Sequence, residues 1–214
     1  PRVMKSNSRP WFLNRTEKLG HAIDIIFDQQ NNVFNSFKSN YNNLIPDHRT
    51  NQINPNNMVF FDEKNKIVYK IAPWKEKRYI NINNNEIEID AGIINEFRAY
   101  KILSKYNETN RIKHVPIMYA CKIIPNTQFA LLVISLNIEI YQKKAKLAQI
   151  NNKLNETGTF IQKADNYLRN KGIRHLDLPG NVYKTNSNKD FFIIDFEQCS
   201  FTENANEITQ KEIN

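Results

Sequence analysis

The chain has 214 residues, of which 40% are hydrophobic and 24% are charged, a composition typical of a folded globular protein. This length suits one domain with a substantial core, or two small lobes that share a cleft. The 30 Lys and Arg residues outnumber the 22 Asp and Glu residues, which gives a net charge of +8. That charge favours encounter with phosphate-bearing ligands in general. It leaves nucleic acid as an alternative partner, which the interleaved acidic residues disfavour.

Cysteine usage and hydropathy indicate an intracellular protein. Cys121 and Cys199 are far apart and have no partner at metal-ligand spacing, so neither a disulfide framework nor a zinc site is expected. The longest apolar stretch, residues 129–134, is far too short to cross a bilayer of about 30 Å. We therefore expect no membrane span and a cytoplasmic location, in a host cell if the source is a virus or parasite.

The first predicted elements, in chain order, are helical. Between residues 17 and 37 the apolar side chains, beginning with Leu19, Ile23 and Ile26, recur at near-helical spacing, which predicts one long or two short amphipathic helices. The usual role of such a stripe is packing onto a neighbouring domain, and partner binding is the alternative. Residues 42–57 are rich in Asn, Pro and Asp and predict a connection.

Two pairs of strands are predicted next. Residues 58–61 and 66–71 flank a polar turn, and alternation along the second strand places Val68 and Lys70 on one face, opposite Tyr69. Residues 79–82 and 86–89 flank a run of Asn and predict another hairpin.

The remaining chain predicts one helix, a pair of strands, a helical region and a short hairpin. The helix spans residues 92–106 and carries Glu96 near the edge of its apolar stripe. The later elements are strands at 117–124 and 129–134, helix over 142–170 with a break near Gly158, and short strands at 182–183 and 191–194 around the polar turn 185–190.

The most informative segment runs from Gly172 to Glu197. Its two turns deliver a carboxylate at Asp177, an amide at Asn181 and a second carboxylate at Asp195. Phosphoryl transfer from ATP needs a carboxylate beside the acceptor hydroxyl and oxygen ligands that hold Mg²⁺ across the phosphates. Turn capping is the alternative role for Asp177 and Asn181. Asp195 follows four apolar residues, and such a carboxylate needs a metal ion or a lysine as partner.

This segment resembles the protein-kinase-like superfamily, which includes aminoglycoside phosphotransferases and choline kinases. The family's catalytic loop reads His-x-Asp followed by Asn, and a hydrophobic strand then leads to Asp-Phe-Gly or a variant. The resemblance implies that Asp177 is the catalytic base, that Asn181 and Asp195 are Mg²⁺ ligands, and that His175 is structural. It extends over residues 58–197, about two-thirds of the chain.

Upstream, the resemblance implies an ATP-binding pair. Lys70 would contact the ATP phosphates, and Glu96 on the following helix would fix the lysine in one rotamer. Glu86 and Glu88 are the alternative partners of Lys70. The implied cofactors are therefore ATP and Mg²⁺.

The implied fold is α+β and two-lobed, with a β-rich N-lobe that contains one embedded helix and a short, mostly helical C-lobe. We place an N-terminal helical extension at residues 1–50, the N-lobe at 51–136 and the minimal C-lobe at 137–214.

The implied function is ATP- and Mg²⁺-dependent transfer of the γ-phosphate to a hydroxyl group, with a serine or threonine of a protein as the favoured acceptor. Two alternatives stay open: a small-molecule kinase, and an inactive pseudokinase that serves as a nucleotide-binding scaffold. They are motivated by the four-residue step from Asp177 to Asn181 where the family has five, by the absence of any glycine between Gly20 and Gly92, and by Glu197 at the usual Gly position. A protein substrate or partner is expected in the leading case.

Overall fold

A computed structural model describes residues 17–47, 56–82, 84–106, 114–147, 158–184 and 191–202. The chain divides into two compact units, the first formed by residues 1–76, 118–136 and 213–214, and the second by residues 77–117 and 137–212. Strands and helices occur in both units, which confirms the predicted α+β class. The predicted boundaries at residues 50 and 136 stay a prediction.

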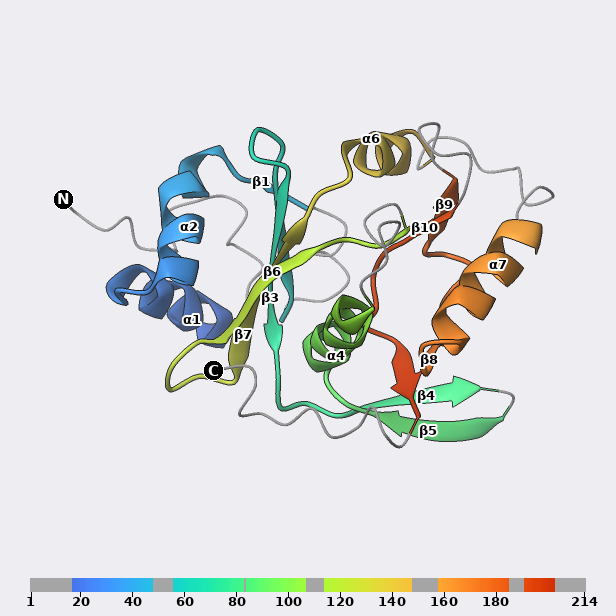
Figure 1. The fold of residues 1–214 in the computed structure, drawn as a ribbon. Coiled ribbons are helices and arrows are strands. Elements are labelled where there is room, and N and C mark those ends of the chain that lie inside the picture. The colour runs from blue at the N-terminus through green and yellow to red at the C-terminus, as the bar shows by residue number, and fades with distance from the viewer. Residues whose placement is uncertain are drawn as a thin grey trace. The chain divides into compact units, whose positions relative to one another are not determined.

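The first unit is built on a five-stranded antiparallel sheet with the order β1-β2-β3-β7-β6 (Figure 1). On the central strand, Lys70 lies opposite Val59 of one neighbour and Leu132 of the other. The strands are β1 (Ile45–Pro46), β2 (Met58–Asp62), β3 (Ile67–Pro73), β6 (Met118–Ile123) and β7 (Phe129–Ser135). The four longer strands confirm the two predicted strand pairs of this unit.

Two helices cover one face of this sheet, as Figure 1 shows in blue. Helix α1 (Glu17–Asp28) and helix α2 (Asn32–Asn40) are separated at Asn31, whose side chain accepts a hydrogen bond of 2.9 Å from Val33 N and caps α2. Their apolar stripes join the side chains of the sheet in one core. The structure thus confirms the two-helix alternative and its packing role.

Aromatic side chains at the centre of this core fix which face of β3 meets the helices. Phe37 of α2 is fully buried and lies edge-on to Tyr69 of β3, with ring centroids 5.4 Å apart. It makes a similar contact with Phe60 of β2 at 5.5 Å. Because neighbouring strand residues point to opposite faces, Lys70 lies on the sheet face away from α1 and α2. The predicted alternation along β3 is confirmed.

In its described residues, the second unit has three two-stranded antiparallel sheets and three helices. Hairpin β4–β5 precedes α4, and the later strands pair as β9 with β10 and β8 with β11. The bounds are β4 (Arg78–Ile82), β5 (Asn85–Ile89), α4 (Gly92–Lys105), α6 (Ile138–Leu147), α7 (Gly158–Arg169), β8 (Ile173–His175), β9 (Val182–Lys184), β10 (Phe191–Ile193) and β11 (Cys199–Phe201).

Most predicted elements of this unit are confirmed. The predicted helical region 142–170, with its break near Gly158, corresponds to α7, which begins at Gly158, and to α6, which begins earlier than predicted, at Ile138. Residues 148–157 and the predicted turn 185–190 lie outside the described residues. Strands β8 and β11 were not predicted. In the first unit, the predicted connection 42–57 contains strand β1 and the end of a short 3₁₀ helix, Tyr41–Asn43.

Helix packing holds the two late strand pairs, β9–β10 and β8–β11, in place. Helix α7 lies against β8, β9 and β10 and buries Ala164 and Leu168, while α4 lies against β11. Phe191 at the start of β10 stacks on His114, with ring centroids 4.3 Å apart, and meets Tyr167 of α7 edge-on. These contacts fix the strands whose ends carry the predicted site residues.

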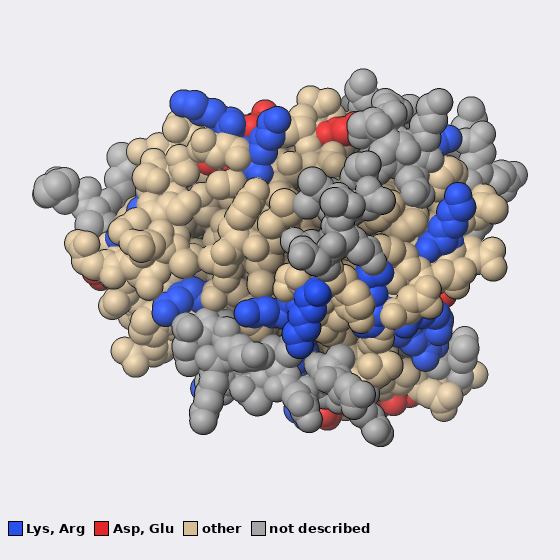
Figure 2. Space-filling model, in the orientation of Figure 1, with Lys and Arg blue, Asp and Glu red and all other residues tan. Residues whose placement is uncertain are grey.

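The surface view shows Lys and Arg side chains in separate groups with other residues between them (Figure 2). Among the described residues, no helix combines the length and the apolar character needed to cross a membrane.

Candidate functional site

The first predicted site turn follows β8 and brings Asp177 and Asn181 together. Asn181 Nδ2 donates to the backbone oxygen of Asp177 at 2.9 Å, and its distance to Asp177 Oδ2 is 3.3 Å. The four-residue step is therefore short enough for the amide to reach the aspartate. Because Nδ2 faces Asp177, the carbonyl end of the same amide points away and is the end that could bind a cation. Asp177 itself is exposed, whereas Asn181 is buried.

The second site turn leaves β10 and contains Asp195. Ile194 N donates to the backbone oxygen of Asn181 at 3.0 Å, so the residue before Asp195 is bonded to the first turn. On the other side, Leu176 N donates to Gln198 O at 2.8 Å and extends the β8–β11 pairing. The two turns that carry Asp177, Asn181 and Asp195 are thus joined by backbone hydrogen bonds.

Asp195 adopts a left-handed backbone conformation with φ of 60°. This conformation costs roughly 1–2 kcal/mol for most residues, and less for Asp and Asn, whose short polar side chains bond locally. Such a conformation persists only where the surroundings hold it. The paired strands on both sides of the turn provide that restraint.

Two rings anchor Phe196, the residue after Asp195. Phe196 is fully buried and meets Tyr100 of α4 edge-on at 5.3 Å between ring centroids. Its other neighbour is His175, at 5.5 Å. This row of rings links helix α4 to both site turns and restricts movement of the backbone at Asp195.

His175 has the structural setting that was predicted for it. Its Nδ1 accepts a hydrogen bond of 3.2 Å from Asp177 N, so the ring proton lies on Nε2 in the neutral form. Within the described part of the chain, Nε2 meets no acceptor at hydrogen-bond geometry. Burial lowers the pKa of His175, while the carbonyls of Ile194 and Asp195 and the carboxylates of Asp195 and Asp177 oppose this shift. The ring is therefore neutral at pH 7.

The lowered pKa of His175 predicts a loss of stability in mild acid. Below about pH 6.5 the unfolded chain binds a proton at this histidine that the folded chain resists, so stability falls as the pH drops through that range. One such group contributes a slope of at most about 1.4 kcal/mol per pH unit. Urea unfolding at pH 7.5 and 5.5 measures it.

His175→Gln should lose this part of the pH dependence, because glutamine does not titrate. His21→Gln, at an exposed position of α1, is the matched control and should keep the wild-type slope. A slope that His175→Gln leaves unchanged would contradict the prediction.

Three carboxylates of the second unit converge at the Asp195 turn. Glu96 of α4, Asp195 and Glu197 can each place an oxygen within 4.8 Å of the others. Carboxylate and amide oxygens are the ligands that Mg²⁺ prefers, so the donor set here suits the predicted ion. Sequence patterns indicated Glu96 and Asp195 but gave Glu197 no role. Glu96 is 1% exposed, so it is buried more deeply than its predicted position near the edge of the apolar stripe.

Lys70 is buried on β3 in the first unit, with 7% of its surface exposed. Its predicted partner Glu96 belongs to the second unit, and their contact stays a prediction. Among the alternative partners, Glu88 is bound by Lys77 and by the hydroxyl of Tyr79. Glu88 is therefore engaged within its own hairpin, and the choice among Glu96, Glu86 and Glu88 as partner of Lys70 stays a prediction.

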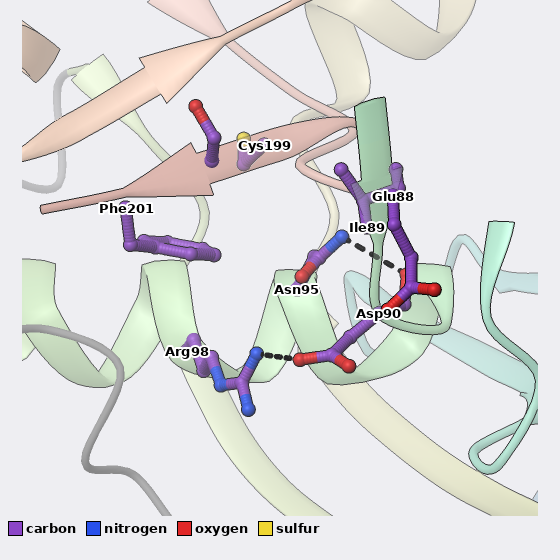
Figure 3. A pocket seen from close by; sticks show the side chains of 8 residues that line it. Glu88, Ile89, Asp90, Asn95, Arg98, Cys199 and Phe201 are labelled. Carbon is purple, nitrogen blue, oxygen red and sulfur yellow. Dashed lines mark hydrogen bonds and ion pairs between the residues drawn. The ribbon is translucent and has the colours of Figure 1, made fainter. Parts of the chain in front are cut away.

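A pocket of about 320 Å³ lies beside α4 in the second unit (Figure 3). Asn95 and Arg98 of α4, Asp90 and Cys199 are among its lining residues, and an ion pair joins Arg98 to Asp90. Burial raises the pKa of the Cys199 thiol well above its usual range, so this thiol is protonated at pH 7. Glu88, an alternative partner of Lys70, lines this pocket, whereas Lys70, Glu96, Asp177, Asn181 and Asp195 do not.

The solved structures similar to this chain include several of WbdD. A crystal structure of WbdD shares 18% identity at a TM-score of 0.45, over 69% of this chain and 31% of that chain. A complex of WbdD with a kinase inhibitor shares 20% at 0.42, over 70% and 32%. A third structure, described as the bifunctional kinase-methyltransferase WbdD, shares 18% at 0.40, over 70% and 31%.

The chain thus spans about a third of the length of the WbdD chains that it matches. No protein-family model matches the sequence, and no curated protein matches it.

Proposed function

We propose that this protein is an ATP- and Mg²⁺-dependent phosphotransferase of the protein-kinase-like type, which transfers the γ-phosphate to a hydroxyl group with Asp177 as the base. The observation that carries the proposal is the hydrogen-bonded connection between the two site turns. Asn181 binds Asp177 through its side chain and the residue before Asp195 through its backbone oxygen. This connection holds Asp177, Asn181 and Asp195 on adjacent turns.

Asp177 is the group that takes the acceptor proton in this proposal. It is exposed, so a hydroxyl can approach it, and its backbone is held by Asn181 and His175. The carboxylate is thereby presented from a fixed loop, which favours the alignment that phosphoryl transfer needs. An exposed base also suits a large acceptor, and we propose a serine or threonine of a protein.

Asn181 and Asp195 are the proposed Mg²⁺ ligands, with the oxygens of Glu96 and Glu197 close to Asp195. Mg²⁺ held by these residues would offset the negative charge that develops during phosphoryl transfer. Lys70 is proposed to bind the phosphates, with its rotamer fixed by Glu96.

The direct test is transfer of radiolabelled γ-phosphate from ATP by the wild-type protein, with Mg²⁺ and with chelator. The acceptors are the protein itself, generic protein substrates and a panel of small hydroxyl compounds. Mg²⁺-dependent label on protein would support the proposal, and label on a small molecule would instead identify a small-molecule kinase. Tight nucleotide binding without transfer to any acceptor would replace the proposal with a pseudokinase function.

Lys70→Met tests the nucleotide-binding part of the proposal. Methionine keeps the length and apolar stem of the side chain but removes the charge, so the fold should survive while kcat/KM for ATP falls about 10- to 100-fold. Lys64→Met, at an exposed position in the turn before β3, is the control and should retain wild-type kcat/KM. Equal kinetics for the two variants would remove Lys70 from the site.

A further inference from the structure

Glu197 occupies the position where kinase-like sequences usually have glycine, and its side chain makes a specific ion pair. Arg78 Nη1 lies 3.1 Å from Glu197 Oε2, although the two residues are 119 positions apart in the sequence. The side chains of Arg78 and Glu197 are 33% and 17% exposed, so the pair is partly shielded from water. Shielding strengthens an ion pair relative to one on the open surface.

The first turn of α4 is shaped to receive the Glu197 side chain. Gly92 is the first residue of the helix, and a Cβ atom placed on it would lie 3.0 Å from Glu197 Cγ and 3.1 Å from its Cβ and Cδ. Such contacts are closer than ordinary van der Waals distances, so a Cβ at position 92 would require the Glu197 side chain to shift by a few tenths of an ångström. The absence of a side chain at Gly92 is what lets Glu197 pack against the helix.

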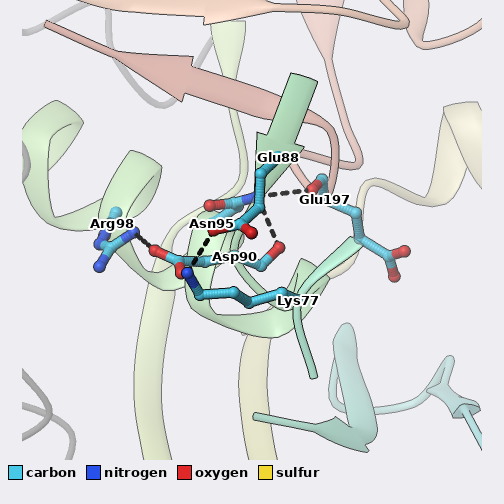
Figure 4. Close-up of polar contacts among 6 residues, drawn as sticks. All are labelled: Lys77, Glu88, Asp90, Asn95, Arg98 and Glu197. Carbon is cyan, nitrogen blue, oxygen red and sulfur yellow. Dashed lines mark hydrogen bonds and ion pairs between the residues drawn. The ribbon is translucent and has the colours of Figure 1, made fainter. Parts of the chain in front are cut away.

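Asn95 fastens the backbone of the same residue. This buried side chain donates from Nδ2 to Glu197 O at 3.0 Å and to Asp90 O at 3.2 Å. Figure 4 shows Asn95 between Asp90 and Glu197. Glu197 is therefore held at its carboxylate by β4, along its stem by Gly92 and at its backbone by α4.

We propose that Glu197 is a positioning residue, which locks the strained turn at Asp195 to α4 and β4 and so holds the proposed Mg²⁺ ligand in one place. Glu197 lies two residues after Asp195, so fixing it leaves the turn between them little freedom. Glycine at this position would offer neither the ion pair nor the contact with Gly92. The expected effect on catalysis rests on the proposed function. The restraint on the Asp195 turn depends only on the contacts of Glu197 within the chain.

A neighbouring ion pair provides a matched control. Lys77 directly precedes Arg78 and binds Glu88, as Figure 4 shows. This hydrogen bond raises the pKa of Lys77 and lowers the pKa of Glu88. Both side chains are more exposed than those of Arg78 and Glu197, at 58% and 42%. Removing this pair changes the charge of the same strand pair without touching the proposed restraint.

The experiment compares Glu197→Gln and Arg78→Gln with Lys77→Gln and Glu88→Gln. The first readout is amide hydrogen exchange over residues 194–199 without nucleotide, which reports opening of the turn. Both site variants should raise exchange there at least about threefold, and the double variant no further than either single one, because the pair acts as a unit. The two control variants should keep wild-type exchange.

The second readout is γ-phosphate transfer. Glu197→Gln and Arg78→Gln should lower kcat about tenfold, with the KM for ATP within about twofold of wild type, as for residues that orient a ligand-bearing group. Gly92→Ala keeps every charge and improves helix propensity, yet should lower kcat in the same way because it displaces Glu197. If Glu197 had only a structural role, the loss of kcat in these variants would instead parallel their loss of stability.

The outcomes separate the two claims. Unchanged exchange over residues 194–199 in the site variants overturns the proposed restraint. Raised exchange with unchanged kcat overturns the positioning role. A wild-type protein that transfers no phosphate to any acceptor overturns the proposed function and its catalytic consequence, while the exchange measurement still decides whether Glu197 restrains the turn.

Discussion

Replacing Asp177 with asparagine is expected to lower γ-phosphate transfer by about 10²- to 10⁴-fold while leaving the fold intact, the range that removal of a general base produces. Asparagine has the shape of aspartate but does not accept the acceptor proton. The backbone bonds of residue 177, from its nitrogen to His175 and from Asn181 to its oxygen, do not depend on the side chain. The affinity for ATP should therefore stay within a few-fold of wild type.

Steady-state transfer and nucleotide binding, measured on the same preparation, check this expectation. Asp165→Asn is the matched control: it removes one carboxylate from α7, where Asp165 pairs with Arg169, and should transfer phosphate at the wild-type rate. Near-normal turnover by Asp177→Asn would remove Asp177 as the base.

The strands and helices with strong periodicity were predictable from the sequence. Alternation along β3 placed Tyr69 and Lys70 on opposite faces, and the structure confirms this because Tyr69 packs against Phe37 of α2. Period-2 alternation predicts the face on which each residue lies wherever one face of a strand is covered by apolar side chains. The same alternation predicted the hairpin β4–β5, and the structure confirms its antiparallel pairing.

Strands β8 and β11 were not predicted because each has only three residues and, unlike the equally short β9 and β10, they do not flank a common polar turn. Their pairing nevertheless sets the site, since Cys199 lies opposite His175 and closes the loop that contains Asp177 and Asp195. Local pattern could indicate the polar residues of these turns, but their approach to one another depends on strand pairs that the sequence signals only weakly.

The contacts of Glu197 could not be predicted, for a different reason. Its partner Arg78 precedes it by 119 residues, and nothing near either residue in the sequence indicates the contact. The burial of Glu96 could not be predicted for the same reason. Residues 91–97 are all buried, so this part of α4 has no solvent-facing side that a sequence pattern could identify. Contacts between distant elements, rather than propensity, decide both cases.

Asp195→Asn should separate activity from stability. The side chain keeps its shape, and asparagine tolerates a φ of 60° as well as aspartate does, so the free energy of unfolding should change by less than about 1 kcal/mol. Loss of the carboxylate weakens the proposed Mg²⁺ site, and transfer should fall more than about a hundredfold at saturating ATP.

Asp195→Ala sharpens this test because alanine is strained at the same backbone conformation. It should lose transfer to the same extent and also unfold with a free energy lower than that of Asp195→Asn by about 1 kcal/mol. Urea unfolding and Mg²⁺-dependent transfer, measured for both variants, distinguish the two effects. If Asp195→Asn retains near-wild-type transfer, Asp195 is not the metal ligand. If the two variants are equally stable, the surroundings do not hold residue 195 in a strained conformation.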